Sequence, residues 1–378
     1  MAQEIVDVNE VAQQCVDAIQ KMIASLTTLN IMAVGKTGVG KSTLINSIFR
    51  ENICEVGIGR PVTSRLCKIT KKGFPLAIYD TRGLELKQEI QDEVRAGIAK
   101  TICDSFKTHD INDTIHCIWY CINATSNRVE DTELEWIQEI STEAGTYNVP
   151  IIVVLTQCYF EEEAYELRKY IESKNLNVAK VVCVLAQDKG PFTAHGLDTL
   201  IKVMEEALPD ELKKTLMNIQ KVCLEEKIKE AHARVVAATA AATTAAATPI
   251  PVSDSIMLVP IQVTMIASIA VTFGIDINKT IITSFISSAL GAGGATLIGK
   301  TMFAQALKLL PGAGQIAGGV INAGTAALIT TALGEVFIQV MIRIYKGEMT
   351  AQSLASKQGK DEIKEMFRTE ITSLSRRG

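Results

Sequence analysis

The sequence predicts a chain of two parts: an α/β domain with a mostly parallel sheet and helices on both faces, followed by an all-α, apolar helical domain. The first prediction rests on short apolar runs that alternate with helical stretches, the pattern of a parallel sheet covered on both faces. The second rests on charge, because only six residues from Val235 to Ile342 are charged, whereas 21% of the whole chain is. At 378 residues the chain has room for both parts.

Composition narrows the classes of function. The net charge of −4 provides no basic surface of the kind that binds a phosphate backbone, so we expect no nucleic-acid partner. All nine cysteines precede Lys227 and none forms a CxxC pair, which favours reduced thiols over disulfides or structural zinc. The first ten residues hold three acids and show no secretory signal. We therefore expect a cytoplasmic protein, with membrane association through the apolar domain left open.

The predicted α/β domain spans residues 31–208. Residues 1–30 precede it as an amphipathic helix, because apolar side chains recur there at spacings of three and four. A strand over Leu66–Thr70 should return through a hairpin into the strand at Leu76 and make one antiparallel edge. The last helix, Leu197–Leu208, is closed by Pro209. The predicted buried strands are Ile31–Val34, Leu76–Tyr79, Ile115–Ile122, Ile151–Leu155 and Val181–Leu185.

Three further segments follow the α/β domain. Residues 209–234 are charged and show no obvious break after Pro209, which predicts a connecting helix. Residues 235–345 form the apolar helical domain, in which prolines and glycines, Gly334 among them, separate four stretches of helix length. Residues 346–378 are polar again and predict a C-terminal helix or tail.

A complete phosphate-binding motif stands between the first strand and a helical stretch. Residues 35–42 read GKTGVGKS and match GxxxxGK[ST] in full. The glycines let backbone N–H groups turn toward phosphate oxygens, and the helix N-terminus adds its positive partial charge. Lys41 should reach the β and γ phosphates, and Ser42 should offer its hydroxyl to Mg²⁺. The predicted nucleotide ligands here are Gly35, Lys36, Thr37, Gly38, Val39, Gly40, Lys41, Ser42 and Thr43.

A second motif, DxxG, begins at Asp80, directly after a predicted strand. Asp80 would hold Mg²⁺ through water, and the N–H of Gly83 would contact the γ phosphate and so distinguish a triphosphate from a diphosphate. Residues 57–63 form a predicted flexible segment in the place of switch I, where Thr63 is the predicted metal ligand and Thr70 the alternative. Together the motifs indicate a P-loop domain of the GTPase type that binds the phosphates of a nucleotide together with Mg²⁺.

The loop that would read the nucleotide base departs from the usual pattern. After the strand at Ile151–Leu155, GTPases carry Asn or Thr, Lys, any residue and Asp, whereas residues 156–159 read TQCY. The missing aspartate would accept from two guanine N–H donors, so the residues by themselves leave GTP and ATP both open. The predicted base-side residues are Thr156, Gln157 and Ala186, and the candidate replacements for the carboxylate are Glu161 and Glu162.

The residue that would position the attacking water is a second departure. Leu84 follows Gly83, where Ras-like GTPases carry a glutamine. We therefore expect slow intrinsic hydrolysis that a partner, or a second copy in a homodimer, completes. Arg60 is the predicted catalytic arginine, with Arg65 and Arg82 as alternatives. Lys41, Thr63 and Gly83 complete the predicted catalytic set.

With these loops, the chain resembles the Era/YfjP-type GTPases that carry a C-terminal YcjF-type domain of unknown function. It is less similar to dynamin-related and immunity-related GTPases. The resemblance implies a P-loop GTPase fold with GTP and Mg²⁺ as ligands, and then a helical domain with suspected membrane association. It covers most of the chain and rests on Gly35–Thr43, Pro61–Thr63, Asp80–Gly83, and in the helical domain on residues 249–251, Asp254, 260–265 and 308–319.

The apolar domain fits two environments. Ser255–Ile275, Thr280–Gly299 and Leu309–Gly334 are uncharged and near the length that crosses a membrane. Gly314 and Gly318 form a GxxxG step, which suits helix contacts in lipid. The same small residues also allow close packing in a soluble helical bundle, so the sequence leaves both environments open.

Three functions are compatible with the sequence. The first is a slow GTPase that acts as a nucleotide-dependent switch or assembly and couples to a membrane or protein partner through its helical domain. The second is a pseudo-GTPase interaction module that binds nucleotide without turning it over. The third is an ATPase on the same fold. Single-turnover hydrolysis and nucleotide competition distinguish them.

Overall fold

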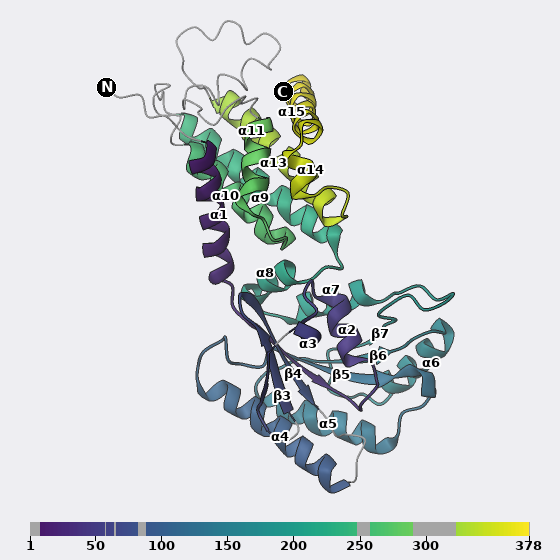
Figure 1. Ribbon diagram of the computed structural model, residues 1–378. Coiled ribbons are helices and arrows are strands. Elements are labelled where there is room, and N and C mark those ends of the chain that lie inside the picture. Colours follow the sequence, from purple (N-terminus) through teal and green to yellow (C-terminus); the bar gives the residue numbers. More distant parts are fainter. Residues whose placement is uncertain are drawn as a thin grey trace, which may run out of the picture. The chain divides into compact units, whose positions relative to one another are not determined.

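The computed structural model describes residues 8–56, 58–63, 66–81, 88–247, 258–289 and 323–377. The chain divides into two compact units, which we name the α/β unit (Leu26–Cys223) and the helical unit (Met1–Ser25 with Leu224–Gly378). The α/β unit is one continuous stretch, whereas the helical unit is built from both ends of the chain (Figure 1). The predicted fold classes of the two parts are confirmed.

The described part of the α/β unit contains a seven-stranded sheet in the order β2-β3-β4-β1-β5-β6-β7. The pairs from β4 through β1, β5 and β6 to β7 are all parallel. This arrangement is the predicted mostly parallel sheet. The strands are β1 (Leu29–Val34), β2 (Ile58–Pro61), β3 (Leu66–Lys71), β4 (Phe74–Thr81), β5 (Cys117–Asn123), β6 (Ile151–Thr156) and β7 (Lys180–Cys183).

The antiparallel edge of the sheet is wider than predicted. β3 pairs antiparallel with β4, as the predicted hairpin requires, and β2 adds a further antiparallel strand outside β3. The prediction of a flexible segment over residues 57–63 is therefore wrong for Ile58–Pro61, whose backbone pairs with Cys67–Thr70. Glycines and Pro61 suggested a loop, but an edge strand tolerates proline, because its outer N–H groups have no neighbouring strand to bond.

Helices cover both faces of this sheet, each over its own apolar core. The side chain of Tyr120 lies in one core and that of Trp119 in the other, where Trp119 stacks on Phe49 with ring centroids 6.0 Å apart. Because β5 is buried on both faces, its apolar run is continuous. The first core is covered by α4 (Gln88–Lys107), α5 (Asp131–Thr146) and α6 (Glu161–Glu172), and the second by α2 (Lys41–Ile48), α3 (Ile53–Val56), α7 (Leu197–Ala207) and α8 (Asp210–Ile219).

The prediction of a single connecting helix over residues 209–234 is wrong. α8 ends at Ile219 within the α/β unit, and α9 (Leu224–Ala247) belongs to the helical unit. Gln220 makes the break, because its extended backbone pairs with Phe49. Its side-chain Oε1 also accepts from the N–H groups of Val222 at 2.6 Å and Cys223 at 2.8 Å. A side chain that bonds nearby backbone amides in this way competes with the helix.

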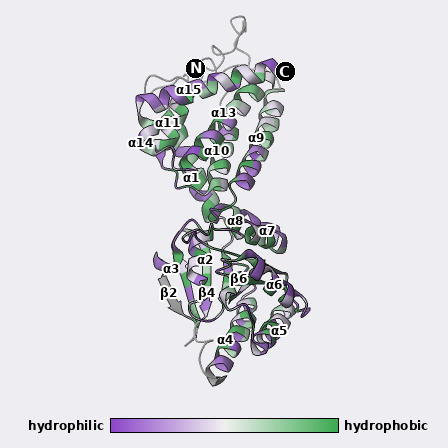
Figure 2. Ribbon diagram, turned by 90° about the vertical axis from the view of Figure 1, so that its right-hand side faces the viewer, coloured by the Kyte–Doolittle hydropathy of each residue, from purple (hydrophilic) through white to green (hydrophobic). Residues whose placement is uncertain are grey.

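The helical unit joins the N-terminal helix to the C-terminal helices. α1 packs against α10 and α11 and buries Val8, Val11, Cys15 and Ile19 in their common core. Hydrophobic residues dominate α10, whereas α15 is largely hydrophilic (Figure 2). Besides α9, the described helices of this unit are α1 (Val8–Ala24), α10 (Leu258–Phe273), α11 (Lys279–Ala289), α13 (Ala323–Tyr345), α14 (Ala351–Ala355) and α15 (Lys357–Arg377).

Gly334 lies inside α13 and does not separate two helices, contrary to the prediction. A Cβ atom at this position would come within 2.5 Å of Val235 Cγ2 on α9 and 3.0 Å of Met265 Sδ on α10. The missing side chain therefore allows three helices to pack closely. A second link joins α9 to α10, because the fully buried Lys227 donates from Nζ to the Thr272 carbonyl at 2.8 Å.

Among the described residues, α13 is the one helix long and apolar enough to cross a membrane. Its most apolar window is 67% buried within the structure, and the core helix of a soluble protein shows the same combination. The GxxxG step at Gly314 and Gly318 lies outside the described residues, as do parts of the stretches Thr280–Gly299 and Leu309–Gly334.

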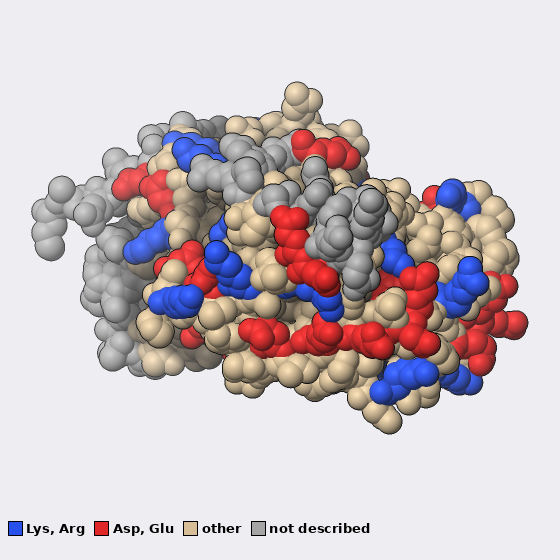
Figure 3. Space-filling model, turned by 90° about the horizontal axis from the view of Figure 1, so that it is seen from below, with Lys and Arg blue, Asp and Glu red and all other residues tan. Residues whose placement is uncertain are grey.

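Acidic side chains gather in a band on one face of the molecule (Figure 3). α5 places Asp131, Glu135, Glu139 and Glu143 at intervals of four residues, so they follow one side of the helix. Arg95 of α4 forms ion pairs with Glu139 and with an aspartate of its own helix. The outer side of α5 is therefore strongly anionic.

Candidate functional site

Residues 35–40 form a tight loop between β1 and α2. Gly35, Gly38 and Gly40 have φ angles of 147°, 79° and 99°, which residues with side chains rarely adopt. Gly35 is also required sterically, because a Cβ atom there would lie 2.5 Å from the Cys121 carbonyl oxygen. α2 begins at Lys41 with no side-chain cap at Gly40. The N-terminal amides of α2 are thus available to an anion.

Lys41 and Asp80 bring the two sequence motifs into one site. The Lys41 side chain is 9% exposed, and its Nζ donates to the carbonyls of Gly35 at 2.7 Å and Lys36 at 3.2 Å. The same nitrogen lies 4.0 Å from Asp80 Oδ1. β1 and β4 are parallel neighbours that pair Ala33 with Asp80, so the sheet places the end of β4 beside the loop that follows β1.

The predicted metal ligands Ser42 and Asp80 lie close to Cys54 of α3, which the sequence analysis missed. Burial together with the nearby charge of Asp80 raises the pKa of Cys54 to about 11, and the Ser42 hydroxyl near the thiol partly opposes that rise. Asn46 Oδ1 accepts from the Cys54 N–H at 3.3 Å and holds α3 to α2. A protonated thiol is a poor ligand, whereas a hydroxyl and a carboxylate are oxygen donors that Mg²⁺ prefers. The residues present fit Mg²⁺.

Lys36, a predicted nucleotide ligand, turns its side chain toward α5. Its Nζ lies 3.3 Å from Glu130 Oε2 and 3.5 Å from Glu133 Oε2. Burial raises the pKa of Glu133, and the Lys36 ammonium opposes that rise. The backbone N–H of Lys36 therefore remains its predicted phosphate contact. Thr37, Ser42 and Thr43 are exposed on the loop and first turn of α2, and Val39 is buried.

Two predicted base-side residues hold the phosphate-binding loop in place. Thr156, at the end of β6, donates from Oγ1 to the Val39 carbonyl at 2.5 Å. Gln157 adopts φ of 56° and donates from Nε2 to the Gly38 carbonyl at 3.2 Å. The loop after β6 is therefore fixed against the loop after β1, as parallel strands on either side of β5 allow.

The loop after β7 is fixed in turn to the loop after β6. The N–H of Cys158 donates to the Val184 carbonyl at 3.2 Å, and His195 Nε2 lies 3.0 Å from the Cys158 carbonyl oxygen. The half-buried Ala186, predicted to contact the base through its N–H, follows directly after these contacts. His195 gave no signal in the sequence, because its contact depends on how the two loops fold together.

Aromatic side chains add a second connection between these loops. Tyr159, which stands where the usual carboxylate would be, accepts through its hydroxyl from Lys189 Nζ at 3.0 Å. The Phe192 ring lies with its centroid 5.4 Å from those of both Tyr159 and Phe160. Lys189 and Phe192 are further residues that the sequence analysis missed, and Glu161 and Glu162 begin α6 beyond this cluster.

The predicted switch I residues lie at the antiparallel edge of the sheet. Thr63 is in the turn between β2 and β3, and a Cβ atom on Gly97 of α4 would come 3.6 Å from its Oγ1. Thr70, the alternative, lies within β3, paired with Ala77. The backbone of Arg60 lies in β2. The other predicted switch residues, Arg65, Arg82, Gly83 and Leu84, are outside the described residues.

Two family models match the chain. Residues 30–157 match the model described as 50S ribosome-binding GTPase, and residues 211–375 match a domain of unknown function, DUF697. Residues 30–157 therefore have the P-loop GTPase fold. The first match contains the phosphate-binding loop, Asp80 and Thr156, and the second runs from α8 into α15.

Relatives of the GTPase domain are distant. Mouse (Mus musculus) septin-9 is 26% identical over 167 residues, which cover 36% of this chain and 27% of septin-9. Human (Homo sapiens) septin-12 is 24% identical over 205 residues, which cover 48% of this chain and 54% of septin-12. The tRNA modification GTPase MnmE of Clostridioides difficile (strain 630) is 29% identical over 154 residues, covering 39% and 30%. The chain therefore spans between 27% and 54% of these relatives' lengths.

Among solved structures, Toc33 from Arabidopsis thaliana in complex with GDP and Mg²⁺ matches 53% of this chain and 91% of the Toc33 chain. The sequence identity is 18% and the TM-score is 0.33.

Proposed function

We propose that this chain binds GTP and GDP with Mg²⁺ and hydrolyses GTP slowly. The observation that supports the proposal is the folded phosphate-binding loop, in which three glycines hold the required backbone and Lys41 lies 4.0 Å from Asp80. The match of residues 30–157 to a GTPase family model and the match to a protein named as a tRNA modification GTPase agree with it. Ser42 and Asp80 would hold Mg²⁺, which neutralises phosphate charge when bound.

The geometry supports a role for each of the protein's own groups. The amides of the loop and of the first turn of α2 donate to phosphate oxygens. Lys41 already lies over the loop, so it reaches a phosphate by exchanging its contacts with the Gly35 and Lys36 carbonyls for phosphate oxygens. Thr156 and Gln157 keep the loop in this shape by bonding the Val39 and Gly38 carbonyls.

Slow hydrolysis is the second part of the proposal. Leu84 has no polar group to orient a water molecule, and Arg60 is the arginine we propose to stabilise transition-state charge. Thr63 and Gly83 are the proposed sensors of the γ phosphate. A partner or a second copy of the chain would complete the site, which makes this GTPase a switch or an assembly.

The helical unit is the proposed output of the switch, through a membrane or protein partner. Both chain connections to the GTPase domain leave from elements that adjoin β1, the strand that ends at the phosphate-binding loop. α1 leads into β1, which ends at that loop, and α9 follows α8, which packs on β1 and β4. The proposal is that β1 transmits a change at the loop to both of these connections. The apolar α13 gives the helical unit one segment suited to a membrane.

Binding of nucleotide by the full-length chain tests the proposal. We expect calorimetry to show GTP binding with micromolar or tighter affinity that EDTA abolishes. Lys41→Ala should weaken binding by about 100-fold or more, whereas Lys202→Ala, a control on the exposed side of α7, should leave it unchanged. Wild-type chain that binds no nucleotide in the presence of Mg²⁺ would contradict the proposal.

Turnover separates the slow GTPase from the pseudo-GTPase that Leu84 also suggests. We expect measurable single-turnover hydrolysis whose rate rises with protein concentration or with added liposomes. Tight GTP binding without any cleavage over hours would identify the pseudo-GTPase. Cleavage at a rate independent of both protein and lipid concentration would refute assembly and membrane coupling.

A further inference from the structure

The two base-side loops present a hydrogen-bond donor where other GTPases present an acceptor. Tyr159 occupies the position of the carboxylate that reads guanine, and its hydroxyl holds the Lys189 ammonium at 3.0 Å. Phe192 packs against Tyr159 and supports this side of the pair. Lys189 is exposed, so its ammonium group is accessible from solvent. The Tyr159–Lys189 pair thus places a positive charge where other GTPases place the negative charge of the carboxylate that reads guanine.

The exchange of charge changes which part of a purine can be read. A lysine ammonium has three donors and no acceptor, whereas a carboxylate has acceptors alone. Guanine and hypoxanthine carry an oxygen acceptor at position 6, and adenine carries an amino donor there. The 2-amino group distinguishes guanine from hypoxanthine, and only an acceptor such as a carboxylate can bond it. An ammonium group therefore favours 6-oxopurines over adenine and is indifferent to the 2-amino group.

Asp188 is the carboxylate next to Lys189 in the same loop. Its Oδ1 accepts from the Ala194 N–H at 2.7 Å and closes the turn that carries Lys189. This contact indicates that Asp188 stabilises the conformation of the loop. It also makes Asp188 the residue to test as an alternative reader of guanine.

We propose that Lys189 determines base specificity by donating to the oxygen at position 6 of a purine nucleotide, and that Tyr159 positions it. The inference rests on the proposed function, because the phosphates must bind at residues 35–42. The proposed substrates are therefore nucleoside triphosphates whose purine carries an oxygen at position 6. GTP and ITP should bind with affinities within about threefold, and ATP should bind at least about tenfold more weakly, as loss of a charged hydrogen bond implies.

Competition for a fluorescent GDP analogue on the full-length chain tests this inference. Lys189→Met should lower the affinity for GTP and for ITP about tenfold each and leave the affinity for ATP unchanged. Lys189→Arg should retain most of the wild-type affinity for GTP and ITP. Tyr159→Phe should weaken GTP and ITP together by a smaller factor. Inorganic triphosphate has no base, so it should bind all these variants as tightly as it binds the wild type. A variant with a folding defect would bind triphosphate more weakly as well, and triphosphate is therefore the control for folding.

The outcomes separate this inference from the proposed function. If no nucleotide and no triphosphate binds, the proposed function fails. If nucleotides bind tightly but the wild type prefers GTP over ITP by tenfold, or if Asp188→Asn removes a preference for GTP, a carboxylate reads the base and the inference is wrong. Equal affinity for GTP and ATP also overturns it. A gain-of-function variant completes the test, since Tyr159→Asp should raise the preference for GTP over ITP about tenfold.

Discussion

Two glycines of the phosphate-binding loop differ in how much space surrounds them, and therefore in how well each position should tolerate a side chain. Gly35 has a φ of 147° and no space for a side chain, since a Cβ atom would lie 2.5 Å from the Cys121 carbonyl oxygen. Gly38 has a φ of 79° with open space around it. We predict that Gly35→Ala lowers the free energy of unfolding of the α/β unit by about 2 kcal/mol or more, and Gly38→Ala by about 1 kcal/mol. Urea denaturation of both variants checks the difference, and equal losses would contradict it.

His116 makes the stability of the α/β unit depend on pH. Burial lowers the pKa of His116 from 6.5 to about 4, a shift that a backbone hydrogen bond to Ile111 partly opposes. Its Nδ1 accepts from the Asn30 N–H at 3.0 Å, which requires the neutral ring. The unfolded chain takes up the proton below pH 6.5 and the folded chain only below about pH 4. The stabilisation is therefore complete above pH 6.5 and is lost as the pH falls toward 4, by about 3 kcal/mol in all.

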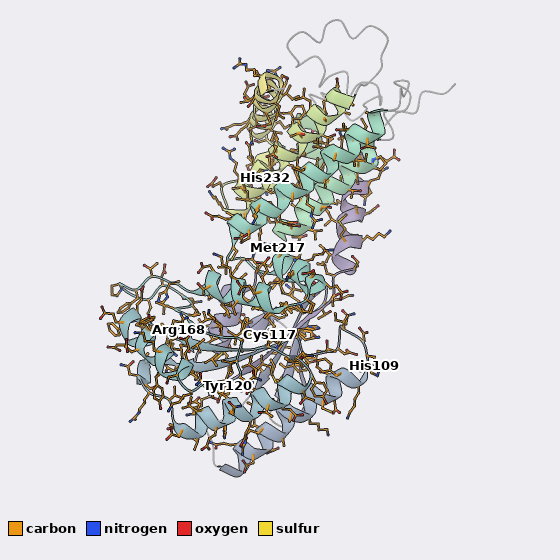
Figure 4. The ribbon with its side chains drawn as sticks, turned by 180° about the vertical axis from the view of Figure 1, so that it is seen from behind. His109, Cys117, Tyr120, Arg168, Met217 and His232 are labelled. Carbon is orange, nitrogen blue, oxygen red and sulfur yellow. The ribbon has the colours of Figure 1, made fainter. Side chains whose placement is uncertain are left out.

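Denaturation at pH 7 and pH 4.5 tests this prediction with two variants. His116→Gln should lose stability at pH 7 and should show less decline between the two values than the wild type. His109→Gln is the control, because His109 is exposed and lies away from the sheet (Figure 4). A decline in His116→Gln as steep as in the wild type would show that other groups cause the acid sensitivity.

At the scale of elements, the predictions that were wrong concern segments whose secondary structure depends on contacts with another segment of the chain. β2 is a strand because β3 lies beside it, and α8 ends at Ile219 because Gln220 bonds Phe49 and two nearby amides. Neither contact leaves a periodic pattern in the sequence. The buried strands β1, β5 and β6 were predicted within a few residues, because their apolar runs are local features.

The packing of α13 on α9 and α10 gives a prediction whose sign is informative. Alanine is a better helix former than glycine by about 1 kcal/mol, so Gly334→Ala would stabilise α13 if only propensity mattered. We expect destabilisation of about 1–3 kcal/mol instead, because the new Cβ would come within 2.5 Å of Val235 Cγ2. The double variant with Val235→Ala should recover part of the loss. Thermal unfolding measures both, with Gln339→Ala on the exposed side of α13 as the control.

At the scale of the whole molecule, the chain's two ends are interdependent. α1 contributes Val8, Val11, Cys15 and Ile19 to the core of the helical unit. We predict that deletion of residues 1–25 destabilises the helical unit by several kcal/mol, at about 1.5–3 kcal/mol for each large buried side chain, while nucleotide binding by residues 26–223 persists. Limited proteolysis should show earlier cleavage within residues 224–378.

A peptide of residues 1–25 added to the truncated chain provides the matched control. It should restore protection of the helical unit, and the same peptide with Ile19→Asp should not. If the truncated chain resists protease as the full chain does, α1 contributes little to the helical core.

The sequence by itself determined the phosphate-binding loop, the alternation of strands and helices and the apolar character of the second domain, because each is written in short-range spacing or composition. The tertiary structure decided which distant residues meet. It placed Asp80 beside Lys41 and Lys189 beside Tyr159, and it joined α1 to α10 and α11. Such contacts arise from parallel strand order and from helix packing between segments far apart in the chain, and no local pattern records them.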